Sequence, residues 1–368
     1  MLSVRRFDRP FTGASLLIRL PTTFAALLAS LTAIGTARAE LVYSIAGPAV
    51  LVIDSASRAT IASILVGDVP YRLAVTPDCA KVYVGQFHES TISVIGAARR
   101  EVIASIPVGI GPRNLAITPD GSKLYSANDE SGNVSIIDTA GDVAVATIAV
   151  ASGYSNLALA ISPDGARAYV ASQQTNTVAV IDSTTNRLIA TVPVGEAPGD
   201  VIVTPDGGKV FVSNFFSGTV SVISAASKAV EATIAVGPGP QDLLATPNGK
   251  LYVAVNDGDV AIIDTASDTM RGAIQSVRSL GFGIALSHDG RRLFVTGAVV
   301  CPGVSRSLAG LALCYLSSVM RGRSTDDATM IDTTDDTVIG VISPSDPDVL
   351  RAFAEKMSRQ SQPNSNCR

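Results

Sequence analysis

The chain carries a four-residue turn motif, Thr-Pro-Asp-Gly or a close variant, that recurs at an almost constant interval of about 42 residues. The copies begin at Thr76, Thr118, Ser162, Thr204 and Thr246, and a degenerate sixth copy begins at Ser287. Pro presets the backbone φ angle for a tight turn, and Gly accepts the positive φ that such turns often need. The spacing therefore predicts a chain built from equal units that all turn sharply at the same place.

The residues around the motif predict four short strands in each unit. In the clearest unit, apolar residues 115–117 precede the motif, residues 123–126 follow it, and residues 134–138 and 145–148 form two further segments. Trp is absent and aromatic residues make up only 5% of the chain, so Val, Ile, Ala and Thr must do the packing, as in short strands. Four-stranded units of this length are typical of the blades of a β-propeller.

The units can be counted from the residue at which the third predicted strand of each unit ends. Seven such ends occur: Asp54, Gly96, Asp138, Asp182, Ser224, Asp264 and Asp332. The first unit lacks its own first strand, and residues 347–350 repeat the Pro-x-x-Leu pattern that opens other units. We therefore predict that residues 349–354 complete the first blade and close the ring, which leaves no unpaired strand edge. The predicted fold is an all-β, seven-bladed β-propeller of four-stranded blades over residues 40–354, followed by a tail at 355–368.

Two segments carry a resemblance to a known family. Residues 112–125 read Pro-x-x-Leu-Ala-Ile-Thr-Pro-Asp-Gly-x-Lys-Leu-Tyr, and residues 134–139 read Val-Ser-Ile-Ile-Asp-Thr. The repeats resemble the YVTN family of bacterial β-propellers, which are often described together with surface-layer or cytochrome-associated propellers. The resemblance covers about residues 41–354. It implies the propeller fold, in a family whose members bind, scaffold and occasionally catalyse, and it supplies no catalytic motif.

The first 39 residues have the pattern of an export signal. The basic residues Arg5, Arg6, Arg9 and Arg19 surround its start, residues 24–34 are apolar, and Ala37-Arg38-Ala39 fits a cleavage site. The alternative is an uncleaved anchor, but a spanning helix needs roughly 20 apolar residues. We predict cleavage after Ala39, a periplasmic or secreted protein, and no membrane span in the mature chain.

The balance of acidic and basic residues indicates which kinds of partner the protein can bind. Without residues 1–39 the chain has 23 basic and 31 acidic residues, and the basic ones form no cluster. Nucleic-acid binding depends on Lys and Arg contacts to phosphates, so we expect no nucleic-acid partner. We expect a monomer that binds an unknown protein partner or a small polar ligand.

Blade topology divides the loops between two faces. The Thr-Pro-Asp-Gly turns and the turns after the third strands share one, here called the turn face. The connections between second and third strands and between blades share the other, here called the loop face. The loops on the loop face vary, which suits recognition, and the polar residues just before each first strand should ring the channel mouth there. The ligand-binding candidates are Arg72, Arg113, Asn114, Asn156, Asp200 and Asp242. The alternative is that they solvate the mouth or cap strand ends.

One loop on the loop face departs from the repeat. About 25 residues are inserted in the seventh unit, at about residues 299–326, and they include Cys301 and Cys314. Long insertions in regular folds are often functional, and we interpret this one as a disulfide-closed lid or docking loop. Cys79 lies in a turn of the second unit, and Cys367 lies beyond the closing strand of the first unit. An exported chain with four cysteines is compatible with disulfides 301–314 and 79–367.

Few residues suggest catalysis. His88 and His288 fall on opposite faces, so they cannot share a metal, and no Cys or His spacing fits a metal or haem site. We expect no metal and no cofactor. The recurrent Asp at third-strand ends are interpreted as turn residues that bond backbone N–H groups. His88 with Glu89 is a weak general-base candidate.

Two function classes remain open. The favoured one is a non-catalytic binding or scaffold propeller that recognises its ligand on the loop face. The alternative resembles a propeller hydrolase or lyase of the lactonase type, acting at the channel mouth near His88 and Arg72. Whether the protein is an enzyme is open, and the missing catalytic set argues against it.

Overall fold

The computed structural model describes residues 41–54, 57, 59–256, 258–275, 279–287, 290–299 and 328–342. All of them belong to one compact unit, Ala39–Arg368. The predicted signal peptide, the insertion, the closing strand at 349–354 and the C-terminal tail lie outside the described residues, so these predictions stay predictions. Within the described ranges, no helix has the length and apolar character needed to cross a bilayer.

The described residues form 27 strands in seven antiparallel sheets, numbered here as blades in chain order. The first blade holds β1 (Leu41–Ala46), β2 (Ala49–Asp54) and β3 (Thr60–Leu65). The second holds β4 (Pro70–Val75), β5 (Lys81–Gln86), β6 (Thr91–Gly96) and β7 (Glu101–Pro107), and the third holds β8 (Pro112–Ile117), β9 (Lys123–Asn128), β10 (Asn133–Asp138) and β11 (Val143–Ala149). The fourth holds β12 (Leu157–Ile161), β13 (Arg167–Ser172), β14 (Thr177–Asp182) and β15 (Arg187–Pro193), and the fifth holds β16 (Pro198–Val203), β17 (Lys209–Asn214), β18 (Thr219–Ser224) and β19 (Ala229–Ala235). The sixth holds β20 (Leu243–Ala245), β21 (Lys250–Ala254), β22 (Val260–Asp264) and β23 (Thr269–Ile274), and the seventh holds β24 (Ser279–Leu286), β25 (Arg292–Val299), β26 (Ala328–Asp332) and β27 (Thr337–Ile342).

This arrangement confirms the predicted fold class, an all-β, seven-bladed propeller. The third strands β6, β10, β14, β18, β22 and β26, and their counterpart β2, end at the seven residues that the repeat predicts. The first blade has three strands among the described residues, ordered β1-β2-β3. Residues 300–327 connect β25 to β26, which is the place where the sequence predicts an insertion.

The starts of several first strands differ from the prediction. The sequence places Arg72, Asn114 and Asp200 just before a first strand, but these residues lie inside the strands. In each case β4, β8 or β16 begins at a Pro two residues before the named residue. Each of these strands contains a register shift near its start. A bulge of this kind adds an unpaired residue and lets the strand continue past an irregularity, which is why the boundary was misplaced.

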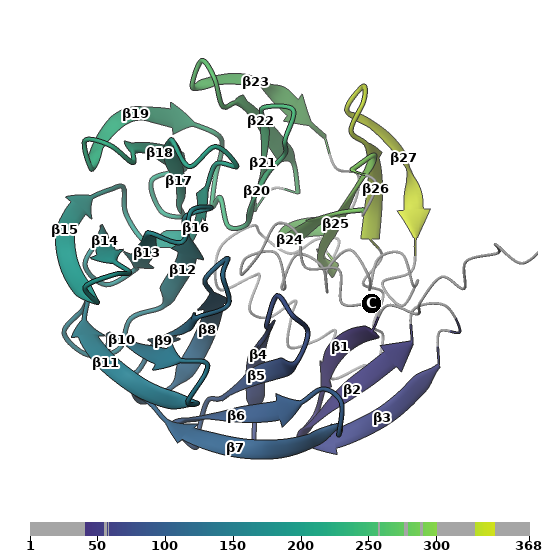
Figure 1. The fold of residues 1–368 in the computed structure, drawn as a ribbon. Helices are drawn as coiled ribbons and strands as arrows, with labels where there is room; N and C mark the ends of the chain where they lie inside the picture. Colours follow the sequence, from purple (N-terminus) through teal and green to yellow (C-terminus); the bar gives the residue numbers. More distant parts are fainter. Residues whose placement is uncertain are drawn as a thin grey trace, which may run out of the picture. The chain divides into compact units, whose positions relative to one another are not determined.

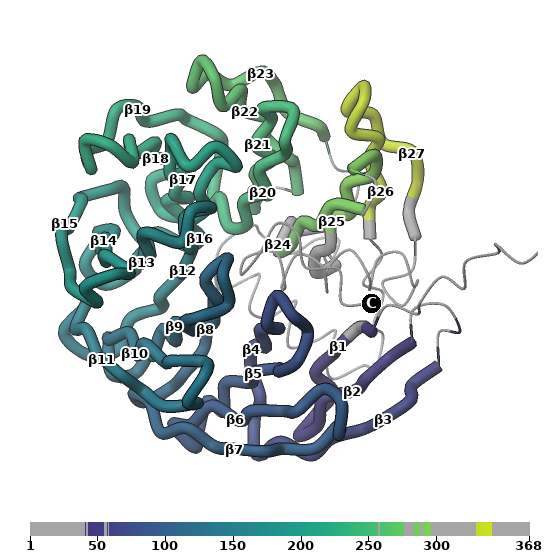
Figure 2. Tube along the Cα trace, viewed as in Figure 1, coloured from purple at the N-terminus to yellow at the C-terminus, as the bar shows by residue number. Residues whose placement is uncertain are grey.

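The first strands of successive blades contact one another, as β4 does β8, β8 does β12, and β12 does β16. In Figure 1 these strands lie innermost and fourth strands such as β7, β11 and β15 lie outermost. Figure 2 traces the chain through the same arrangement. The core lies between blades: one buried cluster joins Tyr125 and Ile136 of the third blade to Leu157 and Val170 of the fourth. Because burial of apolar surface drives folding, each blade stabilises its neighbour.

Several units end in a glycine because neighbouring side chains leave no room for a Cβ atom there, and not because the backbone has a positive φ. A Cβ on Gly109 would lie 2.3 Å from Asn133 Oδ1 and 2.6 Å from Asn128 Nδ2. A Cβ on Gly195 would lie 2.6 Å from the side chain of Asn214. The repeated Val-Gly at unit ends therefore leaves room for a buried amide at the end of the second strand.

Candidate ligand-binding site

On the turn face, the Lys that follows the Thr-Pro-Asp-Gly motif reaches the next blade. Lys81 Nζ donates to the Thr139 carbonyl oxygen at 2.8 Å and to Asp142 Oδ2 at 2.7 Å. The Tyr83 hydroxyl donates to Asp142 Oδ1 at 2.6 Å. We call this set of contacts the latch. Its Lys–Asp contact recurs between Lys209 and Asp268 and between Lys250 and Asp336, and Tyr252 also donates to Asp336. These charged residues therefore hold blades together.

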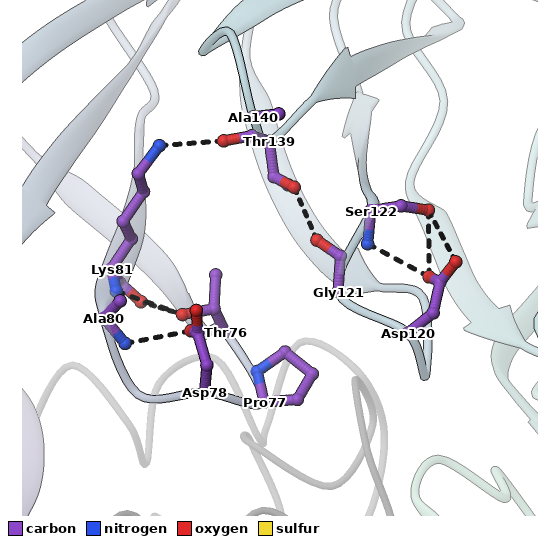
Figure 3. A pocket seen from close by; sticks show the side chains of 10 residues that line it. All are labelled: Thr76, Pro77, Asp78, Ala80, Lys81, Asp120, Gly121, Ser122, Thr139 and Ala140. Atoms are coloured by element: carbon purple, nitrogen blue, oxygen red, sulfur yellow. Dashed lines mark hydrogen bonds between the residues drawn. The ribbon is translucent and has the colours of Figure 1, made fainter.

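A hollow of about 440 Å³ opens on the turn face between the second and third blades (Figure 3). Asp78 in its wall accepts a hydrogen bond from Ala80 N at 3.0 Å, and Asp120 accepts one from Ser122 N at 3.0 Å. Hydrogen bonds from neighbouring Thr hydroxyls hold the pKa of both carboxyl groups below the ordinary value. The Lys81 ammonium group, which lines the hollow, already donates to Asp142 in the latch. The polar groups of this wall are thus engaged in structural contacts.

The recurrent Asp at third-strand ends also act locally. Their carboxylates accept hydrogen bonds from backbone N–H groups of the following turn: Asp54 from Ser57 at 2.7 Å, Asp138 from Gly141 at 2.8 Å, Asp182 from Thr185 at 2.7 Å and Asp264 from Ser267 at 2.9 Å. The interpretation of these residues as turn residues is confirmed.

On the loop face, two of the ligand-binding candidates tie one blade to the next. Asp200 Oδ2 accepts a hydrogen bond from Leu243 N at 3.0 Å. Asp242 Oδ2 accepts one from Ile284 N at 2.8 Å. In both cases a carboxylate of one blade satisfies the backbone N–H at the first strand of the following blade. Asp200 and Asp242 therefore have a structural role, which agrees with the alternative of strand-end capping.

The junction of the third and fourth blades is tied differently. Asn114 occupies the position of those carboxylates and donates to the Leu157 carbonyl oxygen at 2.5 Å. The Leu157 N–H instead donates to Asp129 Oδ1 at 3.0 Å. Asp129 follows β9 on the loop between second and third strands and was not predicted as a site residue. Its signal in the sequence is weak, because the corresponding loop positions in other blades hold unlike residues such as Phe87 and Phe215.

Asp129 holds Arg113, and Arg113 is the centre of the candidate site. Arg113 Nη1 donates to Asp129 Oδ2 at 3.1 Å and also to Asn156 Oδ1. The guanidinium carbon lies 4.9 Å from the centroid of the Tyr71 ring. The Asp129 side chain is completely buried, whereas that of Arg113 is 31% exposed. We call Tyr71, Arg113, Asp129 and Asn156 the Arg113 cluster. It brings together two of the predicted candidates, Arg113 and Asn156, from neighbouring blades.

The electrostatics of this cluster are unusual for the molecule. Burial raises the pKa of Asp129 to about 6, against the opposing effect of hydrogen bonds from Leu157 N–H and Arg113. Desolvation disfavours a charged carboxylate, and a nearby guanidinium favours it. At neutral pH the Asp129 carboxylate is thus ionised although the pH is only about one unit above its pKa, and the Arg113 guanidinium stabilises its charge.

The remaining candidates lie on the loop face but do not join the cluster. His88 Nδ1 lies 3.6 Å from Asp68 Oδ2, and Glu89 Oε1 accepts a hydrogen bond from Asp68 N at 2.9 Å. Both are exposed and both contact Asp68, so the structure directs them to this residue rather than to each other. Arg72 is half-buried on β4. His288 lies outside the described residues.

Of the four cysteines, the structure describes Cys79. Its backbone has a φ of 58°, the positive value that Gly supplies at the same place in other turns, and its side chain is disulfide-bonded. Cys301, Cys314 and Cys367 lie outside the described residues, so the predicted pairings stay predictions. Among the described residues, no group of three or more His, Cys, Asp or Glu side chains is placed to hold a metal ion.

Comparisons with known proteins agree with the fold. The family model described as "Lactonase, 7-bladed beta-propeller" matches residues 100–240. The chain is similar to hydrazine synthase from Kuenenia stuttgartiensis, with a TM-score of 0.54 and 22% identity over 75% of this chain and 88% of that chain. It is also similar to a functionally unknown protein from Desulfotomaculum acetoxidans DSM 771, with a TM-score of 0.63 and 15% identity over 83% of this chain and 95% of that chain. No curated protein matches. The chain is thus a seven-bladed propeller whose central repeats are similar to the lactonase-type propeller family.

Proposed function

We propose that the protein is an exported, non-catalytic binding propeller of the YVTN-repeat kind, which holds its ligand or partner on the loop face at the Arg113 cluster. One observation carries the proposal: Arg113 is oriented by a completely buried carboxylate and stacked near the Tyr71 ring, yet its own side chain remains 31% exposed. Burying an ionised carboxylate is costly unless it is well paired. A residue positioned in this way and still open to solvent is suited to contact a ligand.

Exposed aromatic side chains on the same face support the proposal. Tyr71 is 44% exposed, Tyr154 is 59% exposed and Phe216 is 63% exposed. Tyr and Arg are enriched at recognition surfaces, where aromatic rings supply large contact areas at low entropic cost. On the turn face, by contrast, the latches pair Lys81, Lys209 and Lys250 with Asp side chains of the next blade.

Export to the periplasm or the exterior is proposed from residues 1–39, together with disulfides 79–367 and 301–314. Purification of the full-length gene product from a periplasmic fraction should give a chain that starts at Glu40 by intact mass. Peptide mapping without reduction should yield the two predicted cystine-linked peptides. An uncleaved N-terminus would contradict export with cleavage, and four free thiols would contradict the disulfides.

The binding function is tested by native mass spectrometry and affinity capture with the mature protein from its own periplasm. We expect a co-purifying small molecule or protein that is reduced in the Arg113→Lys variant. Arg99→Lys is the matched control, because Arg99 lies in a turn on the turn face and its side chain is 78% exposed. Capture that is equal in both variants and the parent would place the binding elsewhere and overturn the proposal.

A second candidate is a hydrolase of the lactonase type acting at the channel mouth. The match of the lactonase-type family model to residues 100–240 favours it, since that segment includes Arg113, Asp129 and Asn156. Incubation with a panel of lactones would test it, with His88→Ala and Asp129→Asn as variants. Turnover by the parent that either variant abolishes would favour this candidate over the binding function.

A further inference from the structure

The Arg113 side chain keeps one edge of its guanidinium for a ligand. Its hydrogen bonds to Asp129 and Asn156 both leave from Nη1. A guanidinium carries five N–H donors in a planar fork. The Tyr71 side chain is a further hydrogen-bond partner of Arg113, so two donors on Nε and Nη2 remain. This edge matches the two oxygens of a carboxylate, which Arg binds through two parallel hydrogen bonds.

Two exposed Tyr side chains lie near the Arg113 guanidinium, one at its face and one next to Asn156. The Tyr71 ring centroid lies 4.9 Å from the guanidinium carbon. The Tyr154 hydroxyl donates at 3.3 Å to Asn156 Oδ1, the same atom that accepts from Arg113. Both Tyr side chains are exposed, at 44% and 59%. Tyr71 and Tyr154 are therefore both connected to Arg113, the first directly and the second through Asn156, and they offer apolar surface near a cation.

We infer that the Arg113 cluster binds a small organic acid, in which a carboxylate is joined to an aromatic or other apolar body. The inference rests on the proposed binding function and names the class of ligand. The carboxylate contacts the Nε–Nη2 edge, and the apolar body lies against Tyr71 and Tyr154. A neutral amide of the same shape lacks the negative charge that pairs with the guanidinium. A small hydrophilic anion lacks the apolar group that would contact the Tyr rings.

Binding of an anion at this place is linked to Asp129. The bound carboxylate and Asp129 lie on two edges of the same guanidinium and compete for its charge. The charged groups beside Asp129 are Arg113 from β8 and Glu130 from its own loop, while the fourth blade contributes the neutral Leu157 N–H. Since burial already raises the pKa of Asp129 to about 6, a bound anion favours its protonated form. By linkage, the ligand then binds more tightly as the pH falls from 7.5 to 5.5.

The test uses the mature protein and isothermal titration calorimetry. The probes are 3-phenylpropionate, its neutral amide 3-phenylpropanamide, and acetate, which has the carboxylate without the body. We expect the acid to bind at least about 10-fold more tightly than either comparison compound, which corresponds to about 1.4 kcal/mol. Its Kd should fall several-fold between pH 7.5 and pH 5.5. Arg113→Lys should weaken binding about 10-fold, Asp129→Asn should remove the pH dependence, and Arg99→Lys should change neither.

Equal affinity for the acid and the amide would overturn the inference, and so would unchanged affinity in Arg113→Lys. Urea unfolding of each variant checks that it is folded. Should Arg113→Lys be unfolded, the double variant Arg113→Gln with Asp129→Asn removes the guanidinium without leaving a buried charge. A partner captured in an Arg113-dependent manner by a protein that does not bind the acid would overturn this inference and leave the proposed function standing. If the protein neither binds the acid nor captures a partner through Arg113, both this inference and the proposed function are overturned.

Discussion

The turn face and the loop face use the same kinds of side chain in opposite ways. On the turn face, Lys81 reaches across to the next blade and contacts Asp142, and the same pairing recurs at Lys209 and Lys250. On the loop face, Arg113 contacts Asp129, which has no counterpart at the same loop position in the neighbouring blades. A contact repeated from blade to blade is explained by the assembly of the ring. A contact made once, with a buried charge and an exposed partner, is the better candidate for recognition.

The largest expected effect on stability comes from the loop face. Arg113→Ala leaves the completely buried Asp129 without its cation, and loss of one partner of a buried pair typically costs about 3–5 kcal/mol. Urea denaturation at pH 7.5 measures the free energy of unfolding. The double variant Arg113→Ala with Asp129→Asn should regain most of the loss. A single variant within about 1 kcal/mol of the parent would show that Asp129 does not depend on Arg113.

The pH dependence gives the next effect. The pKa of Asp129 is raised to about 6 in the folded chain from an ordinary value of 3.8. A carboxyl group of this kind contributes stability that is full below about pH 4 and is lost as the pH rises through 6. Two pKa units correspond to about 3 kcal/mol, so this contribution should decrease by up to that amount between pH 4.5 and pH 7.5.

Asp129→Asn should flatten the profile in this interval, as measured by urea denaturation at several pH values. The Asp residues of the turns act with the opposite sign. Hydrogen bonds lower the pKa of Asp78, Asp120 and Asp206, so their contribution is present above about pH 4 and is lost as the pH falls further. A parent profile that keeps its slope after Asp129→Asn would assign the pH dependence to other groups.

Loss of one latch should have a smaller effect. The Lys250 side chain is only 11% exposed and contacts Asp336 at 2.7 Å, and Tyr252 donates to the same carboxylate at 2.6 Å. Lys250→Met leaves that carboxylate with the Tyr hydroxyl, and we expect a loss of about 2 kcal/mol in thermal or urea unfolding. Lys81→Met, whose parent side chain is 24% exposed, should cost less. Equal losses would contradict the dependence on burial.

The smallest predicted effect is a gain. At the junction of the fourth and fifth blades, Arg167 donates to the Ala225 carbonyl oxygen, but Lys228 occupies the position that Asp142 holds in the latch. The buried Tyr169 hydroxyl also has no hydrogen-bond partner. Lys228→Asp supplies an acceptor for both groups and should raise the free energy of unfolding by about 0.5–1 kcal/mol. A decrease would show that the latch geometry is not transferable between blades.

Much of the fold follows from local sequence. The repeated third-strand pattern predicts the end of every third strand at the residue where it is found, from Asp54 to Asp332. Turn chemistry depends on neighbouring residues, such as Pro at one position and Gly two positions later, so it can be read directly. The starts of β4, β8 and β16 lie three residues before the predicted ones, because a bulge depends on pairing with the adjacent strand.

The candidate site follows from the sequence only in part. Arg113 and Asn156 were predicted from their place near the channel mouth, and the structure brings them together. Asp129 was not predicted, because its partners Arg113 and Leu157 lie 16 and 28 residues away in the chain. The structure also engages Asp200 and Asp242 in bonds between blades, which the spacing of the repeat does not reveal.

The repeated turns and strand patterns of the sequence by themselves determined the number of blades, their order and the face on which each loop lies, because turns and strand periodicity are local properties. Only the tertiary structure decided which polar residues the ring uses for its own cohesion and which it leaves for a ligand. That choice depends on the partner that each side chain meets across the junction of two blades. A buried carboxylate under an exposed guanidinium arises from such a meeting, and it distinguishes Arg113 from the other charged residues of the repeat.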